Sequence, residues 1–242
     1  MKDSLSDKTS IAIDRIKTLS NQSLYVAFSG GKDSTVLLDL VQRAGVPYDA
    51  HYNVTTVDPP ELIRFIQKYY PYVFWERPEE TMWQLIVRKE FPPMRIKRYC
   101  CGVLKEGGGT GRLVATGIRW EESKERKNRK MVEQCFKDGS RIYLNPIIDW
   151  TTEEIWQYIY RHHLPVCELY SYKKRLGCIL CPMATKKSKI VDIERYPGFV
   201  KAYKRAFKII IQKRIARGNP FTWKNEDEMF HWWIYGKQPN VV

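Results

Sequence analysis

The sequence predicts an α/β protein with a mostly parallel, doubly wound sheet and a basic, cysteine-containing helical appendage at its C-terminal end. Short β-rich runs alternate with longer segments whose apolar residues recur every three to four positions, a pattern typical of strand–helix units. The chain has 242 residues, of which 43% are hydrophobic, so it can bury the core of a large domain. Together these observations favour parallel strands with helices on both faces.

The first strand–helix unit lies near the start of the chain. Residues 4–20 space isoleucine and leucine mostly three to four positions apart, which predicts an amphipathic helix. Residues 24–28 are consecutive apolar residues before a glycine-rich turn, which predicts a buried strand. Residues 34–44 place apolar side chains on one helical face and end at Gly45, a frequent helix stop. We therefore expect strand, tight turn and helix in this order.

Similar elements recur farther along the chain. We expect strands over residues 49–54 and 112–116, and helices over residues 60–69 and 151–160. The last helix begins at two threonines and carries two glutamates in its first turn, where carboxylates face the positive end of the helix dipole.

The expected organisation is an α/β domain over residues 1–165 and a C-terminal region over residues 166–242 that packs on it. A helix expected over residues 197–217 is basic on one face and apolar on the other. Its basic residues are Lys201, Lys204, Arg205 and Lys208, and its apolar residues are Tyr203, Phe207, Ile210 and Ile211. The basic face fits either a nucleic acid or plain solvent. Near the end of the chain, Trp232 and Trp233 could stack on nucleic-acid bases, but core packing is the expectation.

The charge balance favours an anionic ligand. Lysine and arginine number 41 and aspartate and glutamate number 27, which gives a net charge of +14. Such a field attracts nucleotides, nucleic acids or an acidic partner. No apolar run is long enough to span a membrane, and the first ten residues do not resemble a secretory signal. We therefore expect a cytoplasmic protein with no membrane partner.

The turn after the first strand is the strongest candidate for binding an anion. It consists of Ser29, Gly30, Gly31, Lys32, Asp33 and Ser34. Backbone N–H groups converge at the start of a helix, and glycines let that backbone approach a phosphate closely. The serines add hydroxyl donors, Lys32 adds charge, and Asp33 can cap the helix or help to hold Mg²⁺. The alternative is an ordinary strand-to-helix turn.

These six residues match the SGGxDS signature and resemble the PP-loop ATP pyrophosphatases, the adenine nucleotide alpha hydrolase-like superfamily. Within it, residues 24–182 resemble the phosphoadenosine phosphosulfate (PAPS) reductase family. The matching segments are Thr55–Leu62, Arg98–Cys101, Thr116–Arg119, Asn145–Trp150 and Gly177–Pro182. The resemblance implies that superfamily's fold and an adenine nucleotide at the glycine turn, either ATP or an adenylylsulfate-type compound.

The resemblance also implies roles for individual residues. The six residues of the turn become nucleotide-binding, and Mg²⁺ is expected beside the phosphates. Further candidates for the same site are Asp58, Gly117 and Arg119. The catalytic candidates are Lys32, Asp33 and Arg119. A guanidinium suits an anionic oxygen pair, but an ion pair of Arg119 with Glu121 or Glu122 is an equally good interpretation.

Six cysteines without an export signal indicate reduced thiols, metal ligands or redox chemistry rather than disulfides. Cys100 and Cys101 are adjacent, and Cys178 and Cys181 form a Cys-x-x-Cys motif. This layout resembles the iron–sulfur subgroup of adenylylsulfate reductases, which implies a 4Fe–4S cluster on these four residues. Four thiolates also suit zinc, although two adjacent cysteines turn toward one small ion with difficulty. Packing as small apolar residues is the remaining alternative, and it is the expectation for Cys135 and Cys167.

Two departures from the family pattern direct the functional hypothesis. Family reductases use a cysteine in a short Glu-Cys-Gly-type segment near the C-terminus, and no cysteine follows Cys181 in this sequence. Dedicated reductases also tend to have an altered glycine turn, whereas SGGxDS is intact here. We therefore expect ATP pyrophosphatase chemistry, that is adenylation, coupled to sulfur transfer. DNA, transfer RNA or a sulfur-donor protein is the expected partner.

Two alternatives stay open. One is an adenylylsulfate or phosphoadenylylsulfate reductase that releases sulfite. The other is a non-catalytic nucleic-acid-binding protein whose metal is structural zinc.

Overall fold

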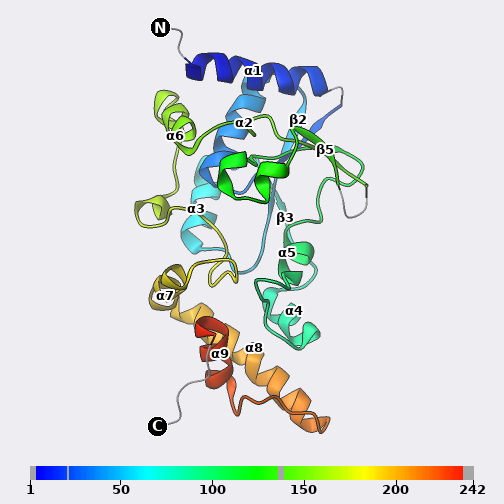
Figure 1. Ribbon diagram of the computed structural model, residues 1–242, viewed down its shortest axis with the longest axis vertical. Coiled ribbons are helices and arrows are strands. Elements are labelled where there is room, and N and C mark those ends of the chain that lie inside the picture. The colour runs from blue at the N-terminus through cyan, green and yellow to red at the C-terminus, as the bar shows by residue number, and fades with distance from the viewer. Residues whose placement is uncertain (1–3, 21, 136–138, 237–242) are drawn as a thin grey trace. The chain divides into compact units, whose positions relative to one another are not determined.

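A computed structural model describes residues 4–20, 22–135 and 139–236 of the chain (Figure 1). The chain divides into two compact units, each assembled from three stretches of sequence. Unit 1 consists of residues 1–53, 60–76 and 107–176, and unit 2 consists of residues 54–59, 77–106 and 177–242. The division after residue 165 stays a prediction. Within the described ranges, no helix is both long enough and apolar enough to cross a membrane.

Unit 1 contains a six-stranded sheet with the strand order β3-β2-β1-β4-β6-β5. The strands are β1 (Leu24–Ala27), β2 (Tyr48–Asn53), β3 (Phe74–Glu76), β4 (Leu113–Ala115), β5 (Val132–Gln134) and β6 (Ile142–Leu144). All neighbouring strands are parallel except β5 and β6, which form an antiparallel pair at one edge. The expected α/β fold with a mostly parallel sheet is confirmed.

Helices of unit 1 hold the first strand and its turn in place. The α-helices are α1 (Ser4–Leu19), α2 (Lys32–Ala44), α3 (Pro60–Tyr69) and α6 (Thr152–Arg161), and the 3₁₀ helices are η1 (Trp120–Glu122), η2 (Arg126–Asn128) and η3 (Glu168–Ser171). Helix α2 packs against both α1 and α6 (Figure 1). Leu24 and Val26 of β1 and Leu37 and Leu40 of α2 are fully buried. Each such side chain stabilises the fold by about 1.5–3 kcal/mol, so the segment between β1 and α2 is anchored at both ends.

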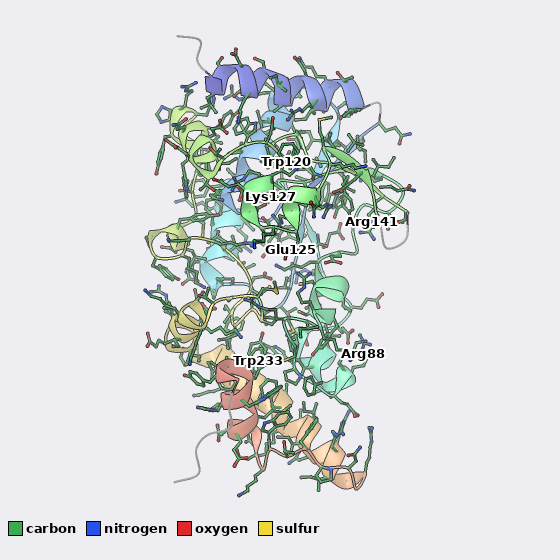
Figure 2. All side chains as sticks on the ribbon, viewed as in Figure 1. Arg88, Trp120, Glu125, Lys127, Arg141 and Trp233 are labelled. Carbon is green, nitrogen blue, oxygen red and sulfur yellow. The ribbon has the colours of Figure 1, made fainter. Side chains whose placement is uncertain are left out.

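Unit 2 carries the helices α4 (Met82–Lys89), α5 (Tyr99–Leu104), α7 (Lys186–Arg195), α8 (Pro197–Ala216) and α9 (Glu226–Tyr235). Helix α8 packs against α4, α7 and α9. Its expected apolar face is buried, with Tyr203 and Phe207 at its centre. Trp233 of α9, labelled in Figure 2, joins this core and donates its indole N–H to the Pro93 carbonyl at 2.8 Å. Core packing of Trp233 is therefore confirmed.

The helices and strands expected from the sequence are present, with ends that differ by a residue or two. Strands β3, β5 and β6, which have three residues each, were not predicted. Helices α4, α5, α7 and α9 were missed as well. The two short 3₁₀ helices that carry Trp120 (η1) and Lys127 (η2), both labelled in Figure 2, also lack any periodic pattern.

Candidate functional site

The glycine turn lies where the strand order of the sheet changes direction. From β1 the chain moves outward through β2 to β3, and it then returns to β4 on the other side of β1. In open α/β sheets, ligands bind at the carboxyl ends of the strands that flank such a point. Ser29–Ser34 follows β1 and Thr116–Arg119 follows β4, so the topology brings these two motifs to one edge.

Gly117 is where the two motifs touch. A Cβ atom at this position would lie 3.0 Å from the backbone carbonyl of Asp33 and 3.2 Å from the backbone nitrogen of Ser34. Backbone atoms at the start of a helix cannot move aside as a flexible side chain would, so a larger residue would displace the turn. Close packing therefore favours glycine at this position.

Gly30 is fixed by its conformation and by its neighbours. Its φ angle is +68°, in the left-handed region that favours glycine. A Cβ atom there would also lie 2.7 Å from the side chain of Leu62 and 3.0 Å from that of Ile66, both on α3. The backbone of the turn thus depends on glycine at this residue.

The two serines of the turn bond to the turn itself. Ser34 is buried, and its hydroxyl donates to the Gly31 carbonyl at 2.9 Å and accepts the Ser29 N–H at 3.2 Å. The hydroxyl oxygens of Ser29 and Ser34 are 3.1 Å apart. Both side chains therefore organise the backbone that was expected to hold the anion.

Asp33 lies between two cations. The Lys32 ammonium donates to both carboxylate oxygens of Asp33, at 2.8 and 3.0 Å. On the other side, Nε of Arg119 donates to Asp33 at 2.7 Å. The structure thus brings the three catalytic candidates together through one carboxylate.

The Arg119 guanidinium is also held by several other protein groups. It is 1% exposed and donates to the Glu121 carboxylate at 3.0 Å, the Trp150 carbonyl at 3.0 Å and the Thr152 hydroxyl at 3.2 Å. Hydrogen bonds, first from Thr152 and then from Arg119, hold the pKa of Glu121 below its usual value. The ion pair of Arg119 with Glu121, one of the interpretations from the sequence, is present. Arg119 also forms an ion pair with Asp33 of the turn.

Sequence reasoning missed Tyr170, which belongs to η3. Its hydroxyl accepts the backbone N–H of Lys32 at 2.8 Å, across 138 positions of sequence. No local pattern marks such a contact, because it depends on how the connection after α6 folds back onto the turn.

The cysteines of the two motifs belong to unit 2. Cys100 and Cys101 lie on α5, whereas Cys178 and Cys181 lie in the loop before α7. All six cysteines of the chain are free thiols, and Cys135 and Cys167 are buried as expected. Charge interactions link Cys100 with each of the other three motif cysteines, so the four thiols share one neighbourhood.

Thiol electrostatics in this group are uneven. The Cys100 thiol donates to the Cys101 sulfur, which lowers the pKa of Cys101 to about 6 and raises the pKa of Cys100. Lys105 also favours the Cys101 thiolate. In turn the pKa of Lys105 is raised, first by the charge of Cys178 and further by that of Asp58. A cation therefore stands beside sulfurs that can ionise.

The Cys-x-x-Cys loop is held by three backbone N–H groups. That of Ile179 donates to the Val57 carbonyl at 2.8 Å, and that of Cys181 donates to the Cys178 carbonyl at 3.2 Å. That of Leu180 donates to the buried Asp192 carboxylate at 3.0 Å. Leu180 adopts a positive φ of 56°, so these bonds hold a turn that few side chains favour.

Four cysteines can fit a metal group by their chemistry, because soft thiolates suit zinc and iron–sulfur clusters. Their arrangement fits less well. Among the residues that the structure describes, no three His, Cys, Asp or Glu side chains are placed to hold a metal ion. The donor set therefore matches a thiolate-bound group, while a preformed site for a single ion is lacking in the described part of the chain.

Asp58, a candidate from the family resemblance, belongs to unit 2. It is buried, and its carboxylate accepts the N–H and the hydroxyl of Thr55, each at 2.7 Å. The Cys178 thiol in turn donates to the Thr55 hydroxyl at 3.5 Å. Asp58 thus lies in the surroundings of the thiols.

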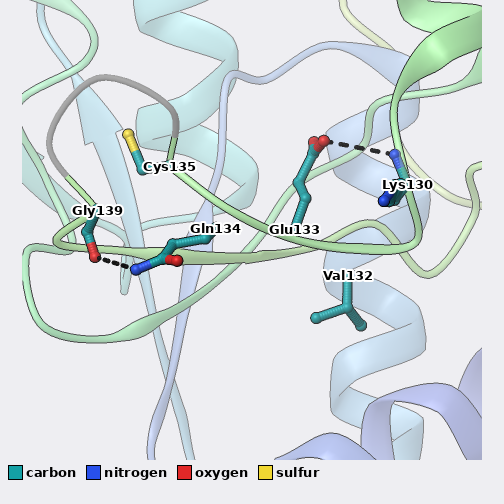
Figure 3. A pocket seen from close by; sticks show the side chains of 6 residues that line it. All are labelled: Lys130, Val132, Glu133, Gln134, Cys135 and Gly139. Carbon is teal, nitrogen blue, oxygen red and sulfur yellow. Dashed lines mark hydrogen bonds between the residues drawn. The ribbon is translucent and has the colours of Figure 1, made fainter.

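A separate pocket lies at β5 and contains none of the candidate site residues (Figure 3). Its lining residues are Lys130, Val132, Glu133, Gln134, Cys135 and Gly139. The Lys130 N–H donates to the Glu133 carboxylate at 3.4 Å, and the Gln134 side-chain amide donates to the Gly139 carbonyl at 3.0 Å. Figure 3 marks both bonds with dashed lines. Polar groups of this pocket therefore bond to one another.

The fold and its glycine turn define an α/β protein of the adenine nucleotide alpha hydrolase-like class. Residues 23–184 match the phosphoadenosine phosphosulfate reductase domain, and the chain belongs to that family. Among solved structures, it resembles the PAPS reductase from Candida auris in a phosphate complex, with a TM-score of 0.54 and 17% identity. That match covers 74% of this chain and 95% of the other, and it is a likeness of fold.

Two curated relatives show how far the sequence similarity extends. An uncharacterised protein of Methanocaldococcus jannaschii is 30% identical over 174 residues, which are 66% of this chain and 36% of that protein. An adenosine 5'-phosphosulfate reductase of Bacillus anthracis is 27% identical over 215 residues, covering 76% of this chain and 86% of the reductase. The chain thus spans little more than a third of the first relative and most of the second.

Proposed function

We propose that the protein is an enzyme that uses ATP to adenylate an acceptor and then serves in sulfur transfer to it. The intact Ser-Gly-Gly-Lys-Asp-Ser turn, braced at the point where the strand order reverses, carries this proposal. Attack of an acceptor oxygen on the α-phosphate of ATP would form the adenylate and release pyrophosphate. Backbone N–H groups and the helix dipole stabilise the charge that develops on the phosphates.

In this proposal, Lys32, Asp33 and Arg119 have different roles. The Lys32 ammonium would neutralise the departing pyrophosphate. Asp33 would hold Mg²⁺, which supplies further charge neutralisation when bound. Arg119, buried and bonded to Asp33, would orient that carboxylate.

The thiol group would serve the sulfur step. Cys100, Cys101, Cys178 and Cys181 would hold a 4Fe–4S cluster, which supplies a site for sulfur or electrons when bound. A cluster offers each thiolate its own iron, whereas zinc needs all the sulfurs around one point. Six free thiols suit a reducing compartment, and we propose the cytoplasm.

A nucleic acid, DNA or transfer RNA, is the acceptor we propose. Unit 2 holds 20 lysines and arginines against 10 aspartates and glutamates, so it carries +10 of the net charge of +14. On α8, Lys201, Arg205 and Lys208 are exposed. Part of this face is neutralised, because Lys204 pairs with Asp227 at 2.5 Å and Lys208 lies 3.9 Å from the Glu226 carboxylate. The remaining charge would attract a phosphate backbone, with a strong dependence on salt.

An assay of pyrophosphate release tests the adenylation step. Protein prepared without oxygen is incubated with ATP, Mg²⁺ and the nucleic acid, and pyrophosphate is measured. We expect release by the wild type and its loss in Lys32→Ala. The control is Lys17→Ala, an exposed lysine on α1 of the same unit. Equal release by Lys32→Ala would contradict the assigned turn.

A sulfonucleotide reductase is the second candidate, favoured by the Bacillus anthracis relative, a reductase of which this chain covers 86%. The same protein would then be incubated with adenylylsulfate and thioredoxin. Release of sulfite, with no pyrophosphate from ATP, would establish the reductase and overturn adenylation. Zinc in metal analysis, together with neither activity, would instead favour a non-catalytic nucleic-acid-binding protein.

A further inference from the structure

Tyr170 places a phenol hydroxyl at the first amide of α2. Its oxygen accepts the Lys32 N–H at 2.8 Å and is 3.4 Å from the position that a Cβ atom would take at Gly31. The hydroxyl thus touches the turn at two residues of the SGGxDS signature.

This hydrogen bond leaves the phenol with a proton to donate. A tyrosine hydroxyl both donates and accepts, and the bond from Lys32 uses only a lone pair of the oxygen. No acceptor for the Tyr170 O–H is present among the residues that the structure describes. Burial raises the pKa of Tyr170 above its usual value, so the hydroxyl keeps its proton at neutral pH. A donor therefore stands at the positive end of a helix, where an anion is favoured.

Contacts that do not involve the hydroxyl hold the Tyr170 ring. The Trp156 ring of α6 packs edge-on against it, with centroids 5.2 Å apart and an interplanar angle of 86°. A phenylalanine would keep this packing. The hydroxyl can therefore be removed with little disturbance of the fold.

We propose that Tyr170 is an anion-binding residue whose hydroxyl accepts the Lys32 N–H and donates to a phosphoryl oxygen of a bound adenine nucleotide or pyrophosphate. The inference rests on the proposed function, because it takes the glycine turn as the nucleotide site. Since the Lys32 amide polarises the phenol that it bonds, the O–H becomes a stronger donor toward the anion. The helix start would thus reach the phosphate through a side chain as well as through the remaining amides.

Tyr170→Phe tests this role, with Tyr160→Phe as the matched control. The Tyr160 ring contacts Trp156 as well, stacked on it with centroids 5.9 Å apart, but Tyr160 is 69% exposed. Calorimetric titration with ATP and with inorganic pyrophosphate gives the Kd of each protein, and thermal melting reports the fold. We expect about tenfold weaker binding of both ligands by Tyr170→Phe and unchanged binding by Tyr160→Phe. Melting temperatures should stay close to that of the wild type.

The other outcomes separate this inference from the proposed function. Equal or tighter binding by Tyr170→Phe would overturn the inference alone. A large fall in its melting temperature would also overturn it, by making the hydroxyl a structural group. Weaker binding by Tyr170→Phe, in a wild type that releases no pyrophosphate from ATP, would support the inference and overturn adenylation. No binding of either ligand by the wild type would overturn both.

Discussion

The glycine turn of unit 1 and the thiol group of unit 2 differ in how complete they are without a ligand. In the turn, Ser34 bonds to the backbone around it, and Asp33 is paired with both Lys32 and Arg119. In the thiol group, the described side chains include no set of three that is placed to hold a metal ion. The protein thus holds the side chains of the glycine turn in contact with one another, whereas the four motif cysteines share one neighbourhood.

Charge explains this difference. A carboxylate and two cations attract one another, so the turn gathers its charged side chains unaided. Thiolates repel one another and must be deprotonated to bind a metal, so their assembly is coupled to the arrival of a cation. Under the proposed function, a nucleotide would bind a turn that is already assembled, whereas a metal group would complete the thiol site.

Loss of one motif cysteine would give the largest effect. Because every thiolate would bind its own iron, Cys181→Ser should lower the iron content of protein prepared without oxygen at least about tenfold. Cys135→Ser, at a buried cysteine outside the motifs, is the control and should keep its iron. Iron retained by Cys181→Ser at the wild-type level would remove Cys181 from the ligand set and weaken the comparison.

Gly117→Ala would test how rigidly the turn is built. The added Cβ would press on the backbone of Asp33 at 3.0 Å, so we expect a loss of about 2–3 kcal/mol in the free energy of unfolding, together with weaker ATP binding. Denaturant titration and calorimetry measure the two effects. Gly107→Ala, where the Cβ would meet nothing within 4 Å, should be close to neutral. Similar results for the two variants would mean that the turn adapts to its neighbours.

Asp192→Ala would test the support of the Cys-x-x-Cys loop. Without its carboxylate, the buried Leu180 N–H loses its acceptor, which should cost about 1–2 kcal/mol of the free energy of unfolding and reduce the iron content. Asp192→Asn keeps an acceptor oxygen and should lose less of both. An unchanged iron content in Asp192→Ala would show that the metal group shapes the loop without this support.

The smallest effect concerns the ion pair of Asp49 on β2 with Arg112, the residue before β4. Hydrogen bonding to Arg112 lowers the pKa of Asp49 to about 2. Because the folded-state pKa is below that of the unfolded chain, the pair stabilises the fold above about pH 4, and this contribution disappears as the pH falls toward 2. Arg112→Gln should therefore lower the free energy of unfolding by about 0.5–1 kcal/mol at pH 6 and by less at pH 3.

Arg64→Gln is the control for this pH dependence. Arg64 and Glu168 form an exposed pair 4.0 Å apart, which should contribute little at either pH. Denaturant titrations at the two pH values measure both variants. A stability difference for Arg112→Gln that grows toward pH 3 would have the wrong sign for the assigned pKa.

Much of the fold could be predicted from the sequence, because each expected element has an apolar period and a stop signal of its own. The helix that ends at Gly45 is an example, since this glycine has a φ of +68° and closes α2 as expected. The three-residue strand β3 could not be predicted this way, because it joins the sheet through its pairing with β2. The position of β3 in the sheet therefore depends on its pairing with β2.

Most residues of the candidate site were predicted from the sequence, but most of their contacts were not. Motif matching selected Gly117 and Arg119, but it could not tell that Gly117 packs on the Asp33 backbone or that Arg119 is enclosed by Trp150 and Thr152. These contacts join segments that are far apart in the chain. The residue types of Gly117 and Arg119 suggested contact with a ligand. Their packing shows that they also support the glycine turn.

By itself the sequence determined the strand–turn–helix unit, the family and the two cysteine motifs, because these depend on residues that are close together along the chain. Only the tertiary structure decided that Tyr170 meets Lys32 and that Asp58 lies among the thiols. The physical reason is that a hydrogen bond or charge contact between distant segments depends on the strand order and packing that bring them together, and no local pattern of side chains records that order.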